Sequence, residues 1–118
     1  MKRVTRSVAA ATLRDLLEHP PRAALAFVRD GAIEAVPATF RLVDGRYLFA
    51  VDGAAGPLPA KAKLVIDDGP WYFDLRGTWM RGPVTRCEAP AGEDSKADWY
   101  ELAPEKTVAW HYGEMRQA

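Results

Sequence analysis

The sequence predicts a mainly β protein: a small antiparallel β-barrel of about six to seven strands with a short N-terminal helix. Two observations lead to this fold class. Short runs rich in β-branched and aromatic residues recur along the chain, and the segments between them contain the Gly, Pro and Asp residues that favour turns. With 118 residues, the chain has the length of one domain.

A short amphipathic helix is expected before the first strand. Leu13, Leu16 and Leu17 have the spacing of one helix face, and Thr12 precedes them as a candidate N-cap. Pro20 ends the helix, because proline lacks the N–H that a helix requires. We therefore expect a flexible lead-in over residues 1–11, a single barrel domain over 12–113 and a C-terminal tail over 114–118.

Three strands joined by tight turns are expected next. The segments that favour strands are 23–28, 32–43 and 46–51. They are separated by Asp30-Gly31 and Asp44-Gly45, which are strong hairpin signals, so the three strands should form an antiparallel meander. Pro37 interrupts the second strand and cannot donate to a ladder, so its amide position must lie at an edge, a bulge or a ligand.

The largest apolar side chains gather in residues 62–85, which we interpret as the central hairpin. Leu64-Val65-Ile66 is followed by the turn sequence Asp67-Asp68-Gly69-Pro70 and by an alternating strand. The apolar residues of one parity in that strand are Trp71, Phe73, Leu75 and Trp79, and they are expected inside the barrel. Gly77 interrupts this pattern, which indicates a bulge or a close backbone approach. Residues 99–102 and 106–112 complete the predicted strands.

Composition and motifs exclude several classes of function. Sixteen basic and sixteen acidic residues cancel, so no overall charge recruits nucleic acid or an anionic membrane. No apolar run approaches the roughly 20 residues of a membrane span, and the basic N-terminus lacks a signal-peptide core, so a cytoplasmic protein is expected. Cys87 is the one cysteine, and His19 and His111 lack a zinc-binding pattern.

The order of these segments resembles the pyridoxamine 5′-phosphate oxidase-like, or FMN-binding split-barrel, family. The segment ALAFVRDGAIEAVPATF is similar to the family's opening Leu-Ala-Thr strand and its Asp-Gly and Pro-Val-x-Phe motifs. KLVIDDGPWYFDLRGTWMRGPV is similar to the paired strands that end in Val-x-Val-x-Gly-x-Ala, and WYELAPEKTVAWHYGEMRQ to the closing segment of a small-protein branch. The resemblance covers about residues 12–113 and implies a split barrel.

In that family FMN lies at a dimer interface, with its phosphate held by Arg, Lys and Ser or Thr. The resemblance therefore implies a homodimer and places Thr39 and Arg41 on the strand that faces the flavin. The family's Ser-x-Lys phosphate-binding stretch is shortened here to DGAAGPLPAKAK, where Lys61 or Lys63 could substitute. Trp110 stands in the closing motif and is expected to pack on the barrel or at the dimer seam. No residue is expected to act as an acid or base, because hydride reaches the flavin directly.

Two functions remain open at this stage. The first is an FMN-dependent oxidoreductase that acts on a small organic substrate. The second is a non-catalytic split-barrel module that has lost tight FMN binding, or that binds haem or a deazaflavin instead. His111 stands where the family usually has Asp, and a neutral imidazole can ligate haem iron.

Overall fold

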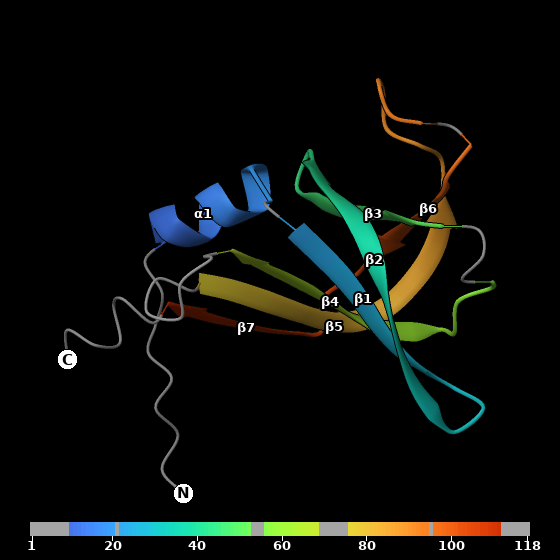
Figure 1. Ribbon diagram of the computed structural model, residues 1–118. Helices are drawn as coiled ribbons and strands as arrows, with labels where there is room; N and C mark the ends of the chain where they lie inside the picture. Colours follow the sequence, from blue (N-terminus) through green and yellow to red (C-terminus); the bar gives the residue numbers. More distant parts are fainter. Residues whose placement is uncertain (1–9, 21, 53–55, 69–75, 95, 112–118) are drawn as a thin grey trace, which may run out of the picture.

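The computed structural model describes residues 10–20, 22–52, 56–68, 76–94 and 96–111. It confirms a mainly β chain with one short helix (Figure 1). The elements in order are α1 (Ala10–Glu18), β1 (Arg22–Arg29), β2 (Ala32–Val43), β3 (Arg46–Val51), β4 (Lys61–Asp68), β5 (Arg76–Cys87), β6 (Asp98–Leu102) and β7 (Lys106–His111).

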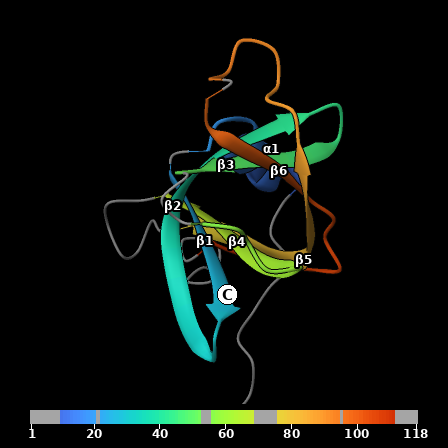
Figure 2. The ribbon, with the colours of Figure 1, turned by 90° about the vertical axis from the view of Figure 1, so that its right-hand side faces the viewer.

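Six of the described strands close into an antiparallel barrel. The strand order is β4-β1-β2-β3-β6-β5, and pairing between β4 and β5 closes the ring (Figures 1 and 2). The first part of β5 also pairs with β7, which extends the sheet beyond the ring, while its last four residues pair with β6. Closure gives each strand of the ring two neighbours over part of its length, which reduces the exposed strand edges that would otherwise invite association through main-chain hydrogen bonds.

The β1-β2-β3 meander forms as predicted, and both of its turns have the expected chemistry. Asp30 and Gly31 have φ values of 52° and 78°, and Asp44 and Gly45 have 50° and 75°. Positive φ at both central residues is the requirement of the type I′ hairpin turn. Pro37 pairs with β1 just before the β2–β3 ladder begins, so its missing N–H interrupts no bond with β3.

The barrel interior is filled by side chains from every strand of the ring, and α1 packs against one end. The largest buried side chains include Phe40, Phe49, Leu25, Leu64, Ile66, Met80 and Leu102. Leu16 of α1 is only 1% exposed and belongs to the same core, so the apolar face of the helix covers this end of the barrel. Asp15 ties the helix to β5 through an ion pair with Arg76 at 2.6 Å. The helix begins at Ala10, so Thr12 lies within its first turn and the prediction of Thr12 as N-cap was wrong.

The inward face of β5 differs from the prediction. Thr78 and Met80 are buried at 0% and 1% exposure, whereas Trp79 is half-buried on the outer face. The Thr78 hydroxyl is satisfied by donating to the Val108 carbonyl oxygen at 2.9 Å, so burying it leaves no free donor. The expectation that Trp79 faces the interior was therefore wrong. Trp71, Phe73 and Leu75 lie outside the described residues.

Candidate functional site

Three basic residues stand side by side on the outer face of the barrel. The β4–β5 register places Lys63 opposite Arg81, and the β5–β7 register places Arg81 opposite Lys106. Directly opposite residues on neighbouring antiparallel strands have Cβ atoms about 5 Å apart, and like charges in such pairs destabilise a sheet. Lys61 lies two residues before Lys63 and therefore on the same face of β4. The sheet thus gathers four cations where repulsion opposes their proximity.

The partners of these cations leave much of the charge uncompensated. Lys61 forms an ion pair with Glu105 at 3.0 Å. The Lys63 ammonium lies 4.1 Å from the centroid of the Trp79 ring, a cation–π contact that neutralises no charge. Neither Lys63 nor Arg81 has a carboxylate partner among the described residues. An anion placed here would relieve the repulsion and gain charge-assisted hydrogen bonds.

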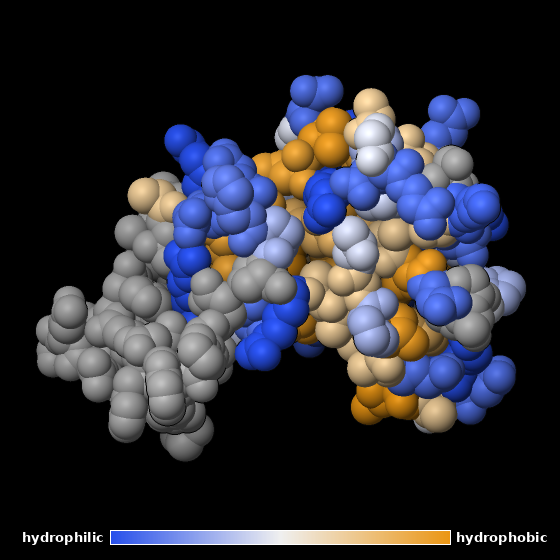
Figure 3. Space-filling model, turned by 45° about the horizontal axis from the view of Figure 1, so that its top comes forward, coloured by the Kyte–Doolittle hydropathy of each residue, from blue (hydrophilic) through white to orange (hydrophobic). Residues whose placement is uncertain are grey.

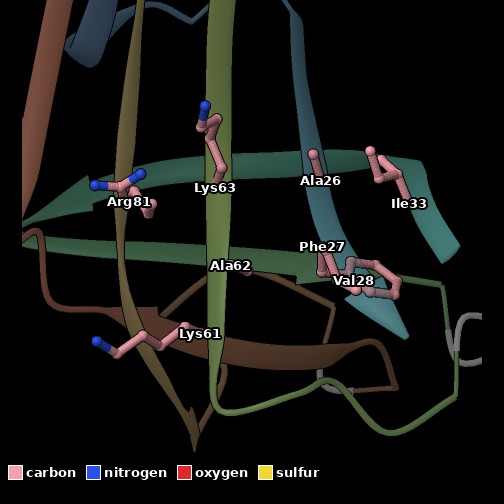
Figure 4. Close-up of a pocket in the computed structure, with 8 residues that line it drawn as sticks. All are labelled: Ala26, Phe27, Val28, Ile33, Lys61, Ala62, Lys63 and Arg81. Atoms are coloured by element: carbon pink, nitrogen blue, oxygen red, sulfur yellow. The ribbon is translucent and has the colours of Figure 1, made fainter. Parts of the chain in front are cut away.

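An apolar wall borders the cations and turns this face into a groove of about 450 Å³. Figure 4 shows Lys61, Lys63 and Arg81 on two adjacent strands, with Ala62 between the two lysines on β4 and the other apolar residues on the neighbouring β1–β2 hairpin. The wall is built by Ala26, Phe27, Val28, Ile33 and Ala62. The groove therefore combines positive charge with apolar surface, the pattern that suits an amphipathic anion.

The hairpin that supplies the apolar wall projects beyond the barrel (Figures 1 and 2). Pairing between β1 and β4 ends at Ala26, so the residues after it have no β4 neighbour. Val28 and Ile33 lie opposite each other on this projection and are 59% and 83% exposed. Separate apolar patches also interrupt the hydrophilic surface in Figure 3. The exposed pair is the part of the wall that a covering molecule could bury.

The structure brings two of the predicted site residues together. Lys61 and Lys63 both line the groove, as a shared site would require. Arg81 is the site residue that sequence reasoning missed. The sequence did indicate that Arg81 lies on the strand that pairs with β4. It did not indicate that Arg81 lies opposite Lys63, because this depends on the register of the two strands across the turn between them.

Thr39 and Arg41 lie on β2, apart from the groove. Thr39 is exposed and borders two small hollows of about 170 and 210 Å³ on either side of the strand. Arg41 donates from Nε to Glu93 at 2.5 Å and from Nη1 to the Phe40 carbonyl oxygen at 2.7 Å. Arg41 thus holds the β5–β6 connection against β2. Within one copy of the chain, these residues do not join Lys61 and Lys63.

Trp110 lies beside the first residues of β5, whereas Arg81 lies in the middle of that strand. Trp110 pairs with Gly77, and a Cβ on Gly77 would collide with the Trp110 indole and come 2.9 Å from the Ile66 carbonyl oxygen. Gly77 therefore permits the close approach that the sequence predicted. The backbone of His111 pairs with Arg76, five residues from Arg81 along β5, which corresponds to roughly 17 Å.

Comparison with known proteins identifies the fold. No family model matches the chain, and no curated protein matches its sequence significantly. Among solved structures, a FAD-binding protein from Mycobacterium smegmatis has a TM-score of 0.68 at 14% identity, covering 86% of this chain and 94% of its own. The chain has the split-barrel fold. A conserved hypothetical protein from Mycobacterium tuberculosis has a TM-score of 0.72 at 15% identity, with 98% and 92% coverage. A candidate pyridoxamine 5′-phosphate oxidase from Corynebacterium glutamicum has 0.68 at 9% identity, with 92% and 94% coverage.

Other titratable groups of this split barrel lie away from the groove. Hydrogen bonding from Arg46 holds the pKa of Glu101 below its ordinary value, and burial raises the pKa of the Cys87 thiol. A raised pKa leaves less of the Cys87 thiol in the nucleophilic thiolate form at neutral pH. In the described ranges, no cluster of His, Cys, Asp and Glu could hold a metal ion. No described helix has the length and apolar character needed to cross a membrane.

Proposed function

We propose that this split barrel binds a flavin nucleotide, FMN in the first instance, and acts as a cytoplasmic flavin-dependent oxidoreductase on a small organic substrate. The observation that carries the proposal is the groove with its unneutralised cations. Lys61, Lys63 and Arg81 bind the phosphate, and the apolar wall around Val28 and Ile33 receives the ring system. The flavin named for the Mycobacterium smegmatis neighbour supports this choice of ligand class.

The residues of the groove fit such a cofactor. A phosphate carries close to two negative charges at neutral pH and presents several acceptor oxygens. Lys63 and Arg81 together supply two uncompensated positive charges. Lys63 donates hydrogen bonds from a compact ammonium and Arg81 from a planar guanidinium. Lys61 adds a third donor, which gives up its ion pair with Glu105 to bind the ligand. An isoalloxazine ring is planar and has an apolar dimethylbenzene edge, which suits the wall on β1 and β2.

The chain's own contribution to the chemistry is to bind and to orient. A bound flavin supplies the redox step, so the protein needs no acid or base of its own. The described lining of the groove consists of apolar residues and cations, and its cations hold the phosphate end of the cofactor in place. Apolar residues at the other end keep water from the ring. The small organic substrate would then approach the exposed ring face.

The proposed active form is a homodimer. Val28 and Ile33 are exposed apolar residues at the rim of the groove, and a second copy of the chain would bury them and cover the ring. Thr39 and Arg41 lie apart from the groove within one copy, so they contact the flavin only when a second copy supplies them. Arg41→Ala should then weaken flavin binding about tenfold. Mixed dimers of Arg41→Ala and Arg81→Met chains should recover one intact site.

The proposal is tested by titrating the protein with FMN, FAD and riboflavin and following the quenching of flavin fluorescence. We expect saturable binding of FMN or FAD at micromolar concentration. Lys63→Ala and Arg81→Met should each weaken that binding by roughly tenfold to a hundredfold, because each removes a charge-assisted contact. Riboflavin, which lacks the phosphate, should bind more weakly and respond little to either change.

Lys96→Ala is the matched control, because it removes one positive charge from the β5–β6 connection outside the groove. It should leave FMN affinity within about twofold. A protein that ignores all three flavins would refute the proposal. Titration with a deazaflavin nucleotide and with haem then tests the alternative of a binding module without flavin chemistry.

A further inference from the structure

A second cavity lies at the mouth of the barrel, on the other side of the β4–β5 wall from the groove. Its volume is about 450 Å³, and it is lined by residues 56–58, Val84, Arg86, Asp98 and Tyr100. Leu58, Val84 and Tyr100 also pack with the barrel core, whereas the cations of the groove stand on the outer face. The cavity is therefore an opening toward the barrel interior and does not belong to the flavin site.

The roof of this cavity is a short piece of the connection between β3 and β4. It is held from two sides: Arg29 donates to the Pro57 carbonyl oxygen at 2.7 Å, and the Val84 N–H donates to the Ala60 carbonyl oxygen at 2.9 Å. These bonds fix residues 56–58 over the mouth without filling it. The space beneath them is preformed, as ligand cavities usually are.

Tyr100 provides the first sign that the cavity takes a polar ligand. The residue is only 8% exposed and stacks on Phe49 with ring centroids 5.6 Å apart. Its hydroxyl has no hydrogen-bond partner in the described part of the chain. The hydroxyl of a largely buried tyrosine usually has a partner, and at a cavity wall a ligand can supply one.

Arg86 and Asp98 provide a donor and an acceptor beside that hydroxyl. Arg86 is paired directly opposite Tyr100 in the β5–β6 register, so the two side chains leave the sheet on the same face. Arg86 donates from Nη2 to Asp98 Oδ1 at 2.7 Å, the one contact between them in the described structure. A guanidinium has five N–H donors and a carboxylate accepts at two oxygens, so both groups retain capacity for a ligand.

We propose that the barrel mouth binds a neutral, planar aromatic molecule that carries a carboxamide. Leu58, Val84 and the Tyr100 ring supply the apolar walls for the aromatic ring. The amide oxygen accepts from Arg86 and from the Tyr100 hydroxyl, and the amide NH₂ donates to Asp98. An aryl carboxylate is a worse match, because its negative charge would face Asp98 and it has no N–H to donate.

The test is an NMR titration of the ¹⁵N-labelled full-length protein with benzamide, and separately with benzoate. Benzamide should shift the backbone resonances of Gly56, Leu58 and Val84, and benzoate should bind more weakly. Tyr100→Phe removes only the hydroxyl and should weaken benzamide binding by about fivefold. Arg86→Ala should weaken it at least as much.

Asp98→Asn separates the two ligands, since it should weaken benzamide binding and strengthen benzoate binding. Thr85→Ala, an exposed neighbour on the opposite face of β5, should change neither affinity. The proposal is overturned if neither probe binds, if the shifts map elsewhere, or if benzoate binds the unmodified protein more tightly than benzamide. Benzamide affinity that is insensitive to Tyr100→Phe and Arg86→Ala also overturns it. Each of these readouts is independent of flavin binding.

Discussion

Replacing Arg81 by glutamate should make the protein more stable while it abolishes flavin binding. Arg81 stands directly between Lys63 and Lys106 in the sheet. Each directly opposite charged pair contributes roughly 0.2–1 kcal/mol, unfavourable for like charges and favourable for opposite ones. Arg81→Glu converts two repulsive pairs into two attractive pairs. We therefore expect the free energy of unfolding to rise by about 1–2 kcal/mol.

Urea denaturation at low and high salt measures this effect. Arg81→Met removes the two repulsions and adds no attraction, so it should give about half of the increase. Surface charge pairs are screened by salt, with a Debye length of about 3 Å at 1 M, so the gain should shrink in 1 M NaCl. Equal or lower stability of Arg81→Glu at low salt would refute the reasoning. A gain that salt leaves unchanged would point to packing rather than charge.

Three further predictions concern the scaffold. Gly82→Ala should destabilise the protein by roughly 1–3 kcal/mol in urea denaturation, because its Cβ would collide with the Ala103 carbonyl oxygen and come 3.0 Å from the carbonyl carbon. Leu16→Ala, which removes the plug of α1 from the core, should destabilise by about 2–5 kcal/mol in the same measurement. The Arg76 hydrogen bond lowers the pKa of Asp15, so this contact stabilises the fold above pH about 4 and is lost as pH falls through the lowered pKa. Asp15→Asn should flatten that part of the pH–stability curve, and an unchanged curve would contradict the assignment.

The parts of the fold that the sequence predicted are those set by local chemistry. Asp30-Gly31 and Asp44-Gly45 supply the positive φ angles that type I′ turns require, so the β1-β2-β3 meander followed directly. The spacing of its leucines predicted the helix, but it did not predict that the helix begins at Ala10. The expectation for β5 failed at Trp79 because alternation alone does not say which parity is buried, and a polar Thr78 with a backbone partner was preferred inside.

The candidate site was only half predictable for a related reason. Lys61 and Lys63 were found because the family resemblance places its phosphate-binding stretch at DGAAGPLPAKAK. The position of Arg81 beside them depends on the register of β4 against β5, and that of Lys106 on the pairing of β5 with β7 across more than twenty residues of chain. Neither pairing can be counted from the sequence. Arg41 was predicted as a site residue, but its partner Glu93 lies 52 residues away, and the sequence did not indicate this contact.

The arrangement of charge supports the proposal that the groove binds an anionic ligand. Sheets normally place opposite charges, or a charge and a neutral residue, at directly opposed positions, because like charges there destabilise the pairing. The pairs Arg22–Asp67 across β1 and β4 and Arg86–Asp98 near the β5–β6 ladder follow that practice elsewhere in this barrel. The row Lys63–Arg81–Lys106 departs from this practice, because it places three positive charges opposite one another. Local rules are most often broken at functional sites, where an interaction formed only on binding compensates for the departure. A bound anion beside this row is the simplest compensation. The increase in the free energy of unfolding of Arg81→Glu without ligand would then measure how much stability the unmodified protein loses by keeping the three cations together.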